Sequence, residues 1–417
     1  MGRAGKTRTG LIAALDVGST KICCLIAQAT NNGSIRVSGV GHQASQGIKN
    51  GAITDMASAQ NAILTAVSAA EEMAGERIRE VILSVSGGNI RSRIFSTEQS
   101  ISGREVNETD VRRLLARAGN LNFPADQELL HCLPVGYTAD GTRGIRDPRG
   151  IFADQLSVNI HLVTARAAAL RNLSTCIERC HLDVECVVVG PYASGLSCLV
   201  EDEIDLGATI IDLGGGTTSV AVFYDSAMIF ADSIAVGGQH VTNDIARGLS
   251  TPLIQAERMK TLYGSAIISP SDEREVIDVP LIGEQSTAHP NHVPRSLLNG
   301  VIRPRMEEIF EMVRAKLDQA GVTKTAGQRL VITGGGSLLS GAPELAGLIL
   351  EKKVRIGRPM KISGLAEATS GPAFSAGAGL LRFAVERTSD NANANDSHAA
   401  RPNSRIGRLG QWIRENF

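Results

Sequence analysis

Aromatic residues, net charge and long apolar runs are scarce in this chain of 417 residues, and each shortage excludes a class of function. Aromatic residues make up only 3%, so stacking platforms for single-stranded nucleic acid are not expected. The 42 basic and 43 acidic residues leave a net charge of −1, without the basic excess of a nucleic-acid-binding protein. No apolar run approaches the roughly 18 residues that cross a bilayer. Asp16 interrupts the apolar stretch behind the basic N-terminus, so we expect no signal peptide and a cytosolic protein of several domains.

Several catalytic and metal-binding motifs are absent from the sequence. The seven cysteines form no C-x-x-C pair, which favours reduced, buried thiols over a zinc site. The eight histidines show no H-x-x-x-H spacing, and none pairs with a loop serine to suggest a nucleophilic triad. The chain lacks the G-x-x-x-x-G-K-[ST] sequence of P-loop proteins. Its glycine turns join strands, which differs from the βαβ unit of a G-x-G-x-x-G fingerprint.

An internal duplication is the main feature that the sequence does contain. Residues 11–26 and 208–223 each hold an apolar strand, an aspartate, a turn of small residues with Ser or Thr, and a second apolar strand. A third strand follows in both copies, at residues 35–42 and 228–238. The repeat is too long for a solenoid, so the pattern predicts two similar domains that face each other.

The segments outside the duplication have a different character. Residues 84–165 combine short strands with one helix, and we expect a separate subdomain in which residues 138–154 form a loop. Asp55 is expected to cap a helix, and an amphipathic helix is expected to start near Pro304.

Three glycine turns follow apolar strands, at residues 16–21, 212–218 and 333–337. Glycine lets the backbone approach an anion closely, and the hydroxyl groups and Lys21 add donors and positive charge. Asp16 and Asp212 would repel bare phosphate, so they predict Mg²⁺ with its waters between carboxylates and phosphates. The third turn lacks a carboxylate and could hold the nucleoside. The predicted nucleotide-binding residues are Asp16, Gly18, Ser19, Thr20, Lys21, Asp212, Gly214, Gly215, Gly216, Thr217, Thr218, Gly334, Gly335, Gly336 and Ser337.

The three turns resemble the two phosphate motifs and the adenosine motif of the actin, Hsp70 and sugar-kinase superfamily. Residues 188–195 and 376–381 resemble its two connecting helices. The resemblance implies an α/β, actin-like (ribonuclease H-like) duplicated fold with a nucleotide cleft between two domains. It also implies that Glu257 and Lys260 contact the adenosine of ATP.

Within that superfamily the chain resembles the FtsA family of bacterial cell-division proteins. Residues 47–55 and 236–246 are similar to signatures of that family, and the insert and the C-terminal tail fit its plan. The resemblance implies subdomain 1A at residues 10–83, 166–204 and 371–386, inserted subdomain 1C at 84–165, subdomain 2A at 205–245 and 300–370, subdomain 2B at 246–299, a disordered linker at 387–403 and a membrane-targeting amphipathic helix at 404–417.

The family resemblance also implies a role. ATP and Mg²⁺ would bind in the cleft, and the chain would assemble with itself into filaments. It would tether the tubulin-like division protein FtsZ to the cytoplasmic face of the inner membrane at the division site, and help recruit later division proteins. The C-terminal peptide of FtsZ would contact Arg305 and Glu308, although these residues are nearly as typical of a solvated helix face.

The C-terminal tail supports this role on physical grounds. Ile406, Leu409, Trp412, Ile413 and Phe417 recur at helical spacing and form one apolar face, with arginines beside it. Such a helix suits an anionic lipid surface, and linked tails would bind it far more tightly than one tail. A C-terminal helix docked on the chain's own core is the alternative.

ATP turnover is expected to be slow or absent. Some superfamily members place Glu just before the proline of the first connecting helix, but Gly190 precedes Pro191 here. A small-molecule kinase of the same fold remains the main alternative function, and it would have no use for a membrane tail. A chaperone ATPase would need a substrate-binding domain that the chain has no room for after residue 386. A cell-shape or pilus-assembly relative is a further alternative.

Overall fold

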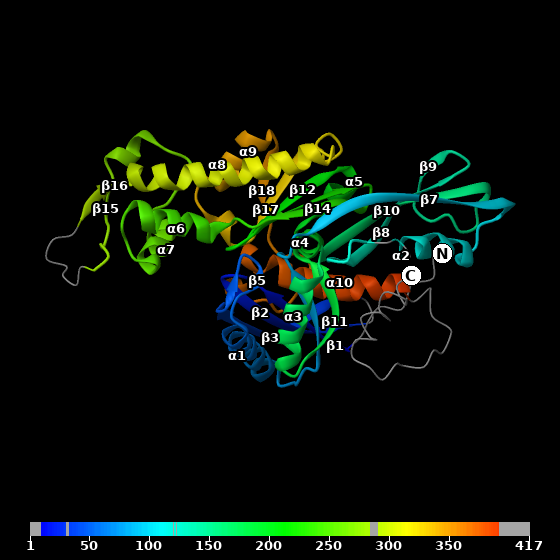
Figure 1. The fold of residues 1–417 in the computed structure, drawn as a ribbon, viewed down its shortest axis with the longest axis horizontal. Coiled ribbons are helices and arrows are strands. Elements are labelled where there is room, and N and C mark those ends of the chain that lie inside the picture. Colours follow the sequence, from blue (N-terminus) through cyan, green and yellow to red (C-terminus); the bar gives the residue numbers. More distant parts are fainter. Residues whose placement is uncertain (1–9, 31–32, 120, 122, 284–290, 392–417) are drawn as a thin grey trace.

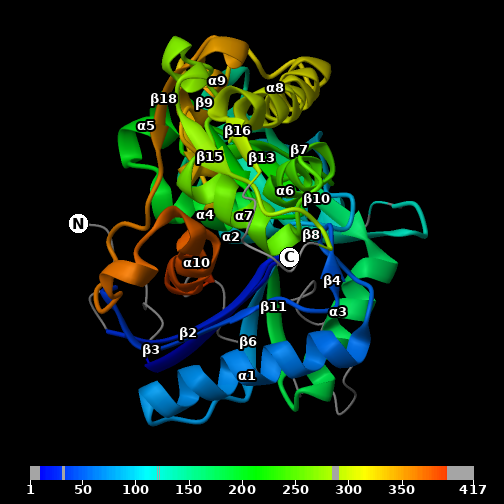
Figure 2. The same cartoon turned by 90° about the vertical axis from the view of Figure 1, so that its left-hand side faces the viewer.

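The computed structural model describes residues 10–30, 33–119, 121, 123–283 and 291–391, with side chains described to residue 386. Two lobes lie one above the other in Figure 2, with helix α10 (Ser375–Asn391) between them. A third unit extends to one side of these lobes, at the right of Figure 1. The linker was predicted to start at residue 387, but α10 continues to Asn391. The rest of the predicted linker, from residue 392, lies outside the described residues. The predicted membrane helix at 404–417 also lies outside them.

The lower lobe is built on a five-stranded sheet in the order β11-β6-β1-β2-β3. Its strands are β1 (Gly10–Val17), β2 (Lys21–Ala29), β3 (Ile35–Ala44), β6 (Glu80–Val85) and β11 (Asp183–Val189). Side chains alternate along β1, so Ala13 and Leu15 belong to the core beneath helices α1 (Met56–Ala74) and α3 (Ala167–Arg179). Ile12 and Ala14 belong instead to the core that α10 covers. Burial of both faces explains the continuous apolar run in β2.

The upper lobe repeats this topology. Its sheet has the order β14-β13-β12-β17-β18, with an antiparallel meander followed by two parallel strands, as in the lower lobe. The strands are β12 (Ala208–Leu213), β13 (Thr218–Tyr224), β14 (Ala227–Ile234), β17 (Arg329–Thr333) and β18 (Lys353–Ile356). Helices α6 (Gly238–Gly248), α8 (Arg295–Gln319) and α9 (Ala342–Leu350) contribute to the core on one face. The predicted duplicated two-domain fold is thereby confirmed.

Helices α4 (Gly190–Cys198) and α10 connect the lobes and pack closely against each other. A methyl group at Gly379 of α10 would lie 1.7 Å from the carbonyl oxygen of Ala193 in α4. Glycine is therefore required where these two helix backbones meet.

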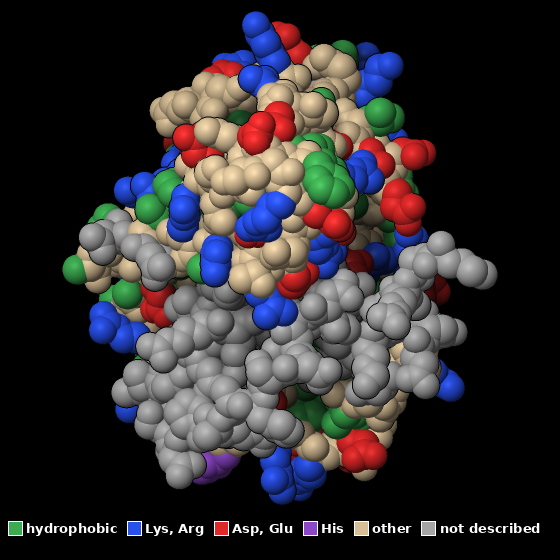
Figure 3. All heavy atoms as spheres, turned by 90° about the vertical axis from the view of Figure 1, so that its right-hand side faces the viewer, with side chains coloured by type: hydrophobic (Ala, Val, Ile, Leu, Met, Phe, Trp, Pro, Cys, Tyr) green, Lys and Arg blue, Asp and Glu red, His purple; other side chains and the backbone are tan. Residues whose placement is uncertain are grey.

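The inserted unit consists of β7 (Arg91–Glu105), α2 (Glu108–Gly119), β8 (Gln127–Ala139), β9 (Thr142–Ile145) and β10 (Phe152–Arg166). Its sheet has the order β7-β10-β8-β9 and its own apolar core. The loop predicted at 138–154 is partly wrong, because β8 extends to Ala139 and turns at Asp140 and Gly141, both with positive φ, into β9. This unit forms one end of the molecule. In Figure 3, which views that end, basic and acidic side chains of the described residues are intermixed.

Beside the upper lobe lie α7 (Leu253–Leu262), β15 (Val276–Asp278) and β16 (His292–Pro294). The helix predicted to start near Pro304 instead begins at Arg295 and contains that proline. Leu298 and Ile302 are buried in the core before Pro304, so tertiary packing outweighs the hydrogen bond that proline removes.

Short elements complete the described chain: β4 (Ile48–Lys49), β5 (Ala52–Ile53), α5 (Glu201–Leu206) and the 3₁₀ turns η1 (Pro270–Glu273), η2 (Gly335–Leu338), η3 (Glu367–Thr369) and η4 (Pro372–Phe374). Asp55 caps α1 as predicted, since its Oδ1 accepts the N–H groups of Ala57 and Ser58. In the part of the chain that the structure describes, no helix combines the length and apolarity that a bilayer span requires.

Candidate nucleotide site

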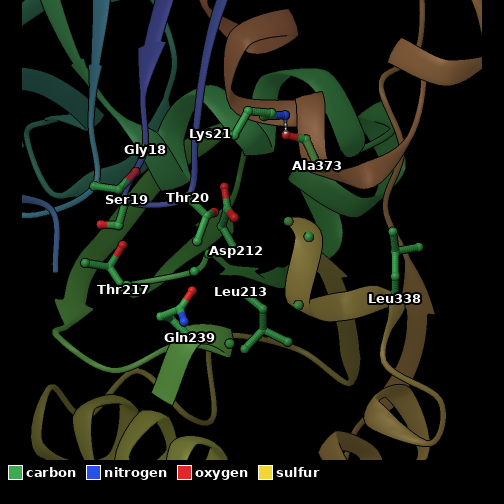
Figure 4. A pocket seen from close by; sticks show the side chains of 18 of the residues that line it. Gly18, Ser19, Thr20, Lys21, Asp212, Leu213, Thr217, Gln239, Leu338 and Ala373 are labelled. Atoms are coloured by element: carbon green, nitrogen blue, oxygen red, sulfur yellow. Dashed lines mark hydrogen bonds between the residues drawn. The ribbon is translucent and has the colours of Figure 1, made fainter. Parts of the chain in front are cut away.

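The three glycine turns meet in one cavity of about 630 Å³ between the lobes. Figure 4 shows labelled side chains from these turns, among them Thr20, Asp212 and Thr217, around a common space. Of the predicted nucleotide-binding residues, all but two line this cavity. Thr218 and Ser337 are buried behind it, where their hydroxyl groups donate to the carbonyl oxygens of Val236 (2.8 Å) and Gly334 (2.7 Å).

The first two turns have the same backbone geometry and touch each other. The N–H of Gly18 donates to Lys21 O (3.0 Å), and that of Gly214 donates to Thr217 O (2.9 Å). A methyl group at Gly216 would lie 2.4 Å from the hydroxyl oxygen of Ser19. A side chain at that position would therefore push the two phosphate-type turns apart.

Two partly buried aspartates face the cavity from equivalent positions at the ends of β1 and β12. Ser84 donates to Asp16 Oδ1, and Ser194 donates to Asp212 Oδ2 at 2.6 Å. Burial raises the pKa of Asp16 despite the Ser84 hydrogen bond, and burial raises the pKa of Asp212 to about 6. A nearby cation would stabilise the charged form of both groups.

The donor set suits Mg²⁺ better than a transition metal. Among the described residues, no group of three or more His, Cys, Asp or Glu side chains is placed to hold a metal. The cavity instead offers the two aspartates at the phosphate-type turns, with Ser and Thr hydroxyl groups beside them, all hard oxygen donors. Mg²⁺ is typically held by one or two carboxylates, its own waters and substrate phosphates, so these residues fit it.

Lys21 lies on the rim of the cavity and is already engaged. Its ammonium group donates to Ala373 O at 2.5 Å, as the dashed line in Figure 4 shows, and lies 3.4 Å from the centre of the Phe374 ring. Burial lowers its pKa, while neighbouring groups that include Asp16 and Asp212 oppose that change. Lys21 therefore links the first turn to η4, the segment that leads into α10.

The predicted adenosine contacts, Glu257 and Lys260, are joined in a network between α7 and α6. Lys260 Nζ donates to Glu257 Oε2 (2.7 Å), to Thr242 Oγ1 (2.9 Å) and to Gly238 O (3.2 Å). Thr242 Oγ1 also donates to Glu257 Oε2 at 2.5 Å. The two side chains are held in place beside the cavity by the helix next to the second turn.

Sequence reasoning missed several residues that line the cavity or support it. The lining ones are Ser45, Ser86, Ser219, Gln239, Val241, Thr261, Met306, Ile309, Leu338 and Leu339, and Ser84 and Ser194 lie behind the aspartates. Gln239 and Val241 lie in the 236–246 segment and Leu338 and Leu339 directly follow the third turn, whereas the others are scattered over both lobes, where no local motif marks them. Gln239 had one signal, since it follows directly on the glycines of the 236–246 segment. It is the one amide side chain among the described residues that line the cavity.

Arg305 and Glu308, the residues predicted to bind a partner peptide, lie away from the cavity on α8. Arg305 Nε donates to Asp244 Oδ2 of α6 at 2.6 Å, and a second guanidinium nitrogen pairs with Glu308. These pairs raise the pKa of Arg305. The Arg305 side chain is 29% exposed and Glu308 is 51% exposed, so a partner would meet an internally paired guanidinium.

The fold is similar to known actin-like structures. It matches a chain of the PilM–PilN type IV pilus biogenesis complex with a TM-score of 0.64 and 17% identity, over 91% of this chain and 99% of that one. It matches MreB5 of Spiroplasma citri bound to ADP with a TM-score of 0.54 and 15% identity, over 92% of this chain and 99% of that one. At such identities the likeness shows the fold alone, and it confirms the predicted actin-like architecture.

Sequence comparison is more specific. A family model described as "Cell division protein FtsA" matches residues 209–379, and one described as "SHS2 domain inserted in FTSA" matches residues 87–164. The chain is 43% identical to the cell division protein FtsA of Rhizobium meliloti (strain 1021), over 98% of this chain and 96% of that protein. Identity to FtsA of Pseudomonas aeruginosa is 35% and to that of Escherichia coli (strain K12) is 31%, each over 98% of both chains. This chain belongs to the FtsA family of bacterial cell division proteins.

Proposed function

We propose that the chain binds ATP with Mg²⁺ between its lobes and acts as a nucleotide-dependent membrane tether for FtsZ at the division site. One observation carries the nucleotide part: three glycine turns and two partly buried carboxylates, far apart in sequence, line a single cavity. A volume of about 630 Å³ lies within the range of small-molecule and cofactor sites. The MreB5 relative of the same fold is a complex with ADP, which supports a nucleotide as the ligand.

Different residues of the cavity would bind the phosphates, the metal and the nucleoside of the ligand. Backbone N–H groups and hydroxyls of the first two turns would bind the phosphates, and Asp16 and Asp212 would hold hydrated Mg²⁺. The bound metal would neutralise charge on the phosphates. The Glu257–Lys260 network would contact the ribose, and the apolar side chains Met306 and Leu338 would pack near the base.

Nucleotide binding would set the angle between the lobes, because its contacts come from both of them. The first turn belongs to the lower lobe and the other two to the upper lobe. A ligand that contacts both sides favours the closed arrangement by its differential affinity for that state. We expect turnover to be slow or absent, because Gly190 precedes Pro191 of the first connecting helix, where some superfamily members carry Glu.

We assign the membrane and partner functions to other parts of the chain. The tail at 404–417 would bind anionic lipid through Ile406, Leu409, Trp412, Ile413 and Phe417, as a peripheral anchor on the cytoplasmic face. Self-assembly would link many tails and strengthen attachment through effective concentration. The FtsZ C-terminal peptide would contact Arg305 and Glu308 on α8, and later division proteins would bind the insert.

Calorimetric titration of ATP into the full chain tests the nucleotide function. Binding should be tighter with Mg²⁺ than with EDTA, and Asp212→Asn should remove most of that difference. Asp278→Asn, an exposed carboxylate on β15, is the matched control and should bind like the wild type. No heat of binding with the wild type in Mg²⁺ would reject the proposal.

Co-sedimentation with anionic liposomes tests the tether. The full chain should pellet in Mg²⁺-ATP, whereas a chain ending at Arg387 should stay in the supernatant. A truncated chain that pellets equally would reject the tail as the anchor. A screen of sugars and polyols for ATP-dependent phosphorylation tests the kinase alternative, and a product above background would favour it over the tether.

A further inference from the structure

Each of the two cleft carboxylates is held by a buried serine from a different structural element. Ser84 lies on β6, the strand parallel to β1, and donates to Asp16 Oδ1. Ser194 lies on α4 and donates to Asp212 Oδ2 at 2.6 Å. Ser84 is 1% exposed and Ser194 is fully buried, so neither hydroxyl is available to solvent. The two lobes thus reach the same arrangement of carboxylate and hydroxyl by separate routes.

A hydrogen bond to one carboxylate oxygen fixes a torsion that is otherwise soft. The χ2 angle of aspartate is broad and nearly two-fold, so the side chain alone does not orient its oxygens. The second oxygen of Asp212 needs glycine beside it, because a methyl group at Gly334 would lie 2.3 Å from Oδ1. Ser194 therefore holds one oxygen of the Asp212 carboxylate, and Oδ1 lies beside the third glycine turn that lines the cavity.

The support of Asp212 extends into the helices that connect the lobes. Ser197, one turn after Ser194 on α4, donates to Ser375 O of α10 at 2.8 Å. The hydroxyl of Ser375 is 2.7 Å from that of Thr333, the residue directly before Gly334. A continuous buried path of hydrogen bonds and packed backbone thus joins Asp212, both connecting helices and the third turn.

We propose that Ser84 and Ser194 are positioning residues, which hold one oxygen of each cleft carboxylate and leave the other to the hydrated Mg²⁺ of the bound nucleotide. This inference rests on the proposed nucleotide function. Ser194 also ties the carboxylate of Asp212 to α4, so movement of the connecting helices changes how that carboxylate faces the cleft.

The test is a Mg²⁺ titration of labelled-ATP binding by the full chain, compared with the affinity for the same nucleotide in EDTA. Ser194→Ala and Ser84→Ala should each raise the half-saturating Mg²⁺ concentration about tenfold, the typical effect of losing a hydrogen bond behind a metal-binding group. Their nucleotide affinity in EDTA should stay unchanged. Ser265→Ala is the matched control, since this buried serine does not line the cavity and its hydroxyl donates to the backbone oxygen of Ile267 rather than to a carboxylate.

Each outcome supports or overturns the assignment. Equal weakening with and without Mg²⁺, or the same shift in Ser265→Ala, would mean a packing effect and overturn it, as would an unshifted Mg²⁺ titration. Because the two serines lie on different elements, β6 and α4, either variant decides the question if the other fails to fold. A wild-type chain that binds no nucleotide defeats the proposed function itself, whereas a binding wild type with matching variants defeats only the positioning role.

Discussion

His131, a residue of the insert, is buried where the insert meets both connecting helices, and its protonation should control acid stability. Its Nε2 accepts the N–H of Val189, the residue before α4, at 3.0 Å. Its ring packs edge-on against Tyr192 of α4 (5.4 Å) and Phe383 of α10 (6.1 Å). Burial, with a smaller contribution from His161, lowers the pKa of His131 to about 3.

The size of the effect follows from the difference between the folded and unfolded pKa values. An unfolded histidine titrates near 6.5, so between pH 6.5 and 3 the unfolded chain binds a proton that the folded chain does not. The free energy of unfolding therefore falls as pH decreases through this window. From pH 7 to pH 5, protonation of this one residue in the unfolded chain lowers the free energy of unfolding by about 2 kcal/mol. This value is nearly the same for any folded pKa below about 4.

The perturbation is His131→Gln, which keeps an oxygen able to accept the Val189 N–H but cannot titrate. Urea unfolding of the wild type and the variant at pH 7, 6 and 5 gives both free energies of unfolding. The difference between the two proteins should shift by about 2 kcal/mol in favour of the variant as pH falls from 7 to 5. His181→Asn is the control, because His181 is exposed and its positive φ of 61° suits asparagine.

Parallel pH dependence of the wild type and His131→Gln would refute the reasoning. It would mean that His131 takes up its proton in the folded state, and hence that the junction between the insert and the connecting helices admits water. A shift of the same size in His181→Asn would equally contradict the assignment of the effect to burial.

Three further predictions concern other parts of the chain. Gly216→Val should abolish nucleotide binding in a calorimetric titration while the fold persists by circular dichroism, because the side chain would collide with Ser19; retained affinity would contradict the close contact of the two turns. Asn299→Ala should lower the free energy of unfolding measured in urea by about 1–3 kcal/mol, since it removes the acceptor of the buried Ser265 N–H and one of the two donors to Asp272 Oδ2; an unchanged free energy of unfolding would show that water replaces the Asn299 amide. Arg305→Glu should weaken binding of an FtsZ C-terminal peptide in fluorescence anisotropy, and an unchanged affinity would reject that assignment.

Much of the fold was predictable because it depends on local patterns. Alternating and continuous apolar runs marked the strands of both sheets, and small-residue turns marked their ends. The repeat of strand, aspartate and glycine turn predicted two similar lobes, which the matching strand orders confirm. The loop prediction at 138–154 was partly wrong because Asp140 and Gly141 form a tight turn between two strands. The helix start near Pro304 was wrong because the residues before this proline are held in the helix by tertiary packing.

The sequence by itself determined which residues could form a phosphate-type turn, because glycine, hydroxyl and carboxylate residues must stand next to one another in the chain for that purpose. It could not determine what stands behind those turns. Ser84 and Ser194 lie on other elements than the aspartates to which they donate, and the imidazole of His131 in the insert accepts the N–H of Val189 just before α4. The contacts of His131 with Val189, Tyr192 and Phe383, like those of the two serines, depend on how strands and helices distant in sequence pack together, and only the tertiary structure decided them.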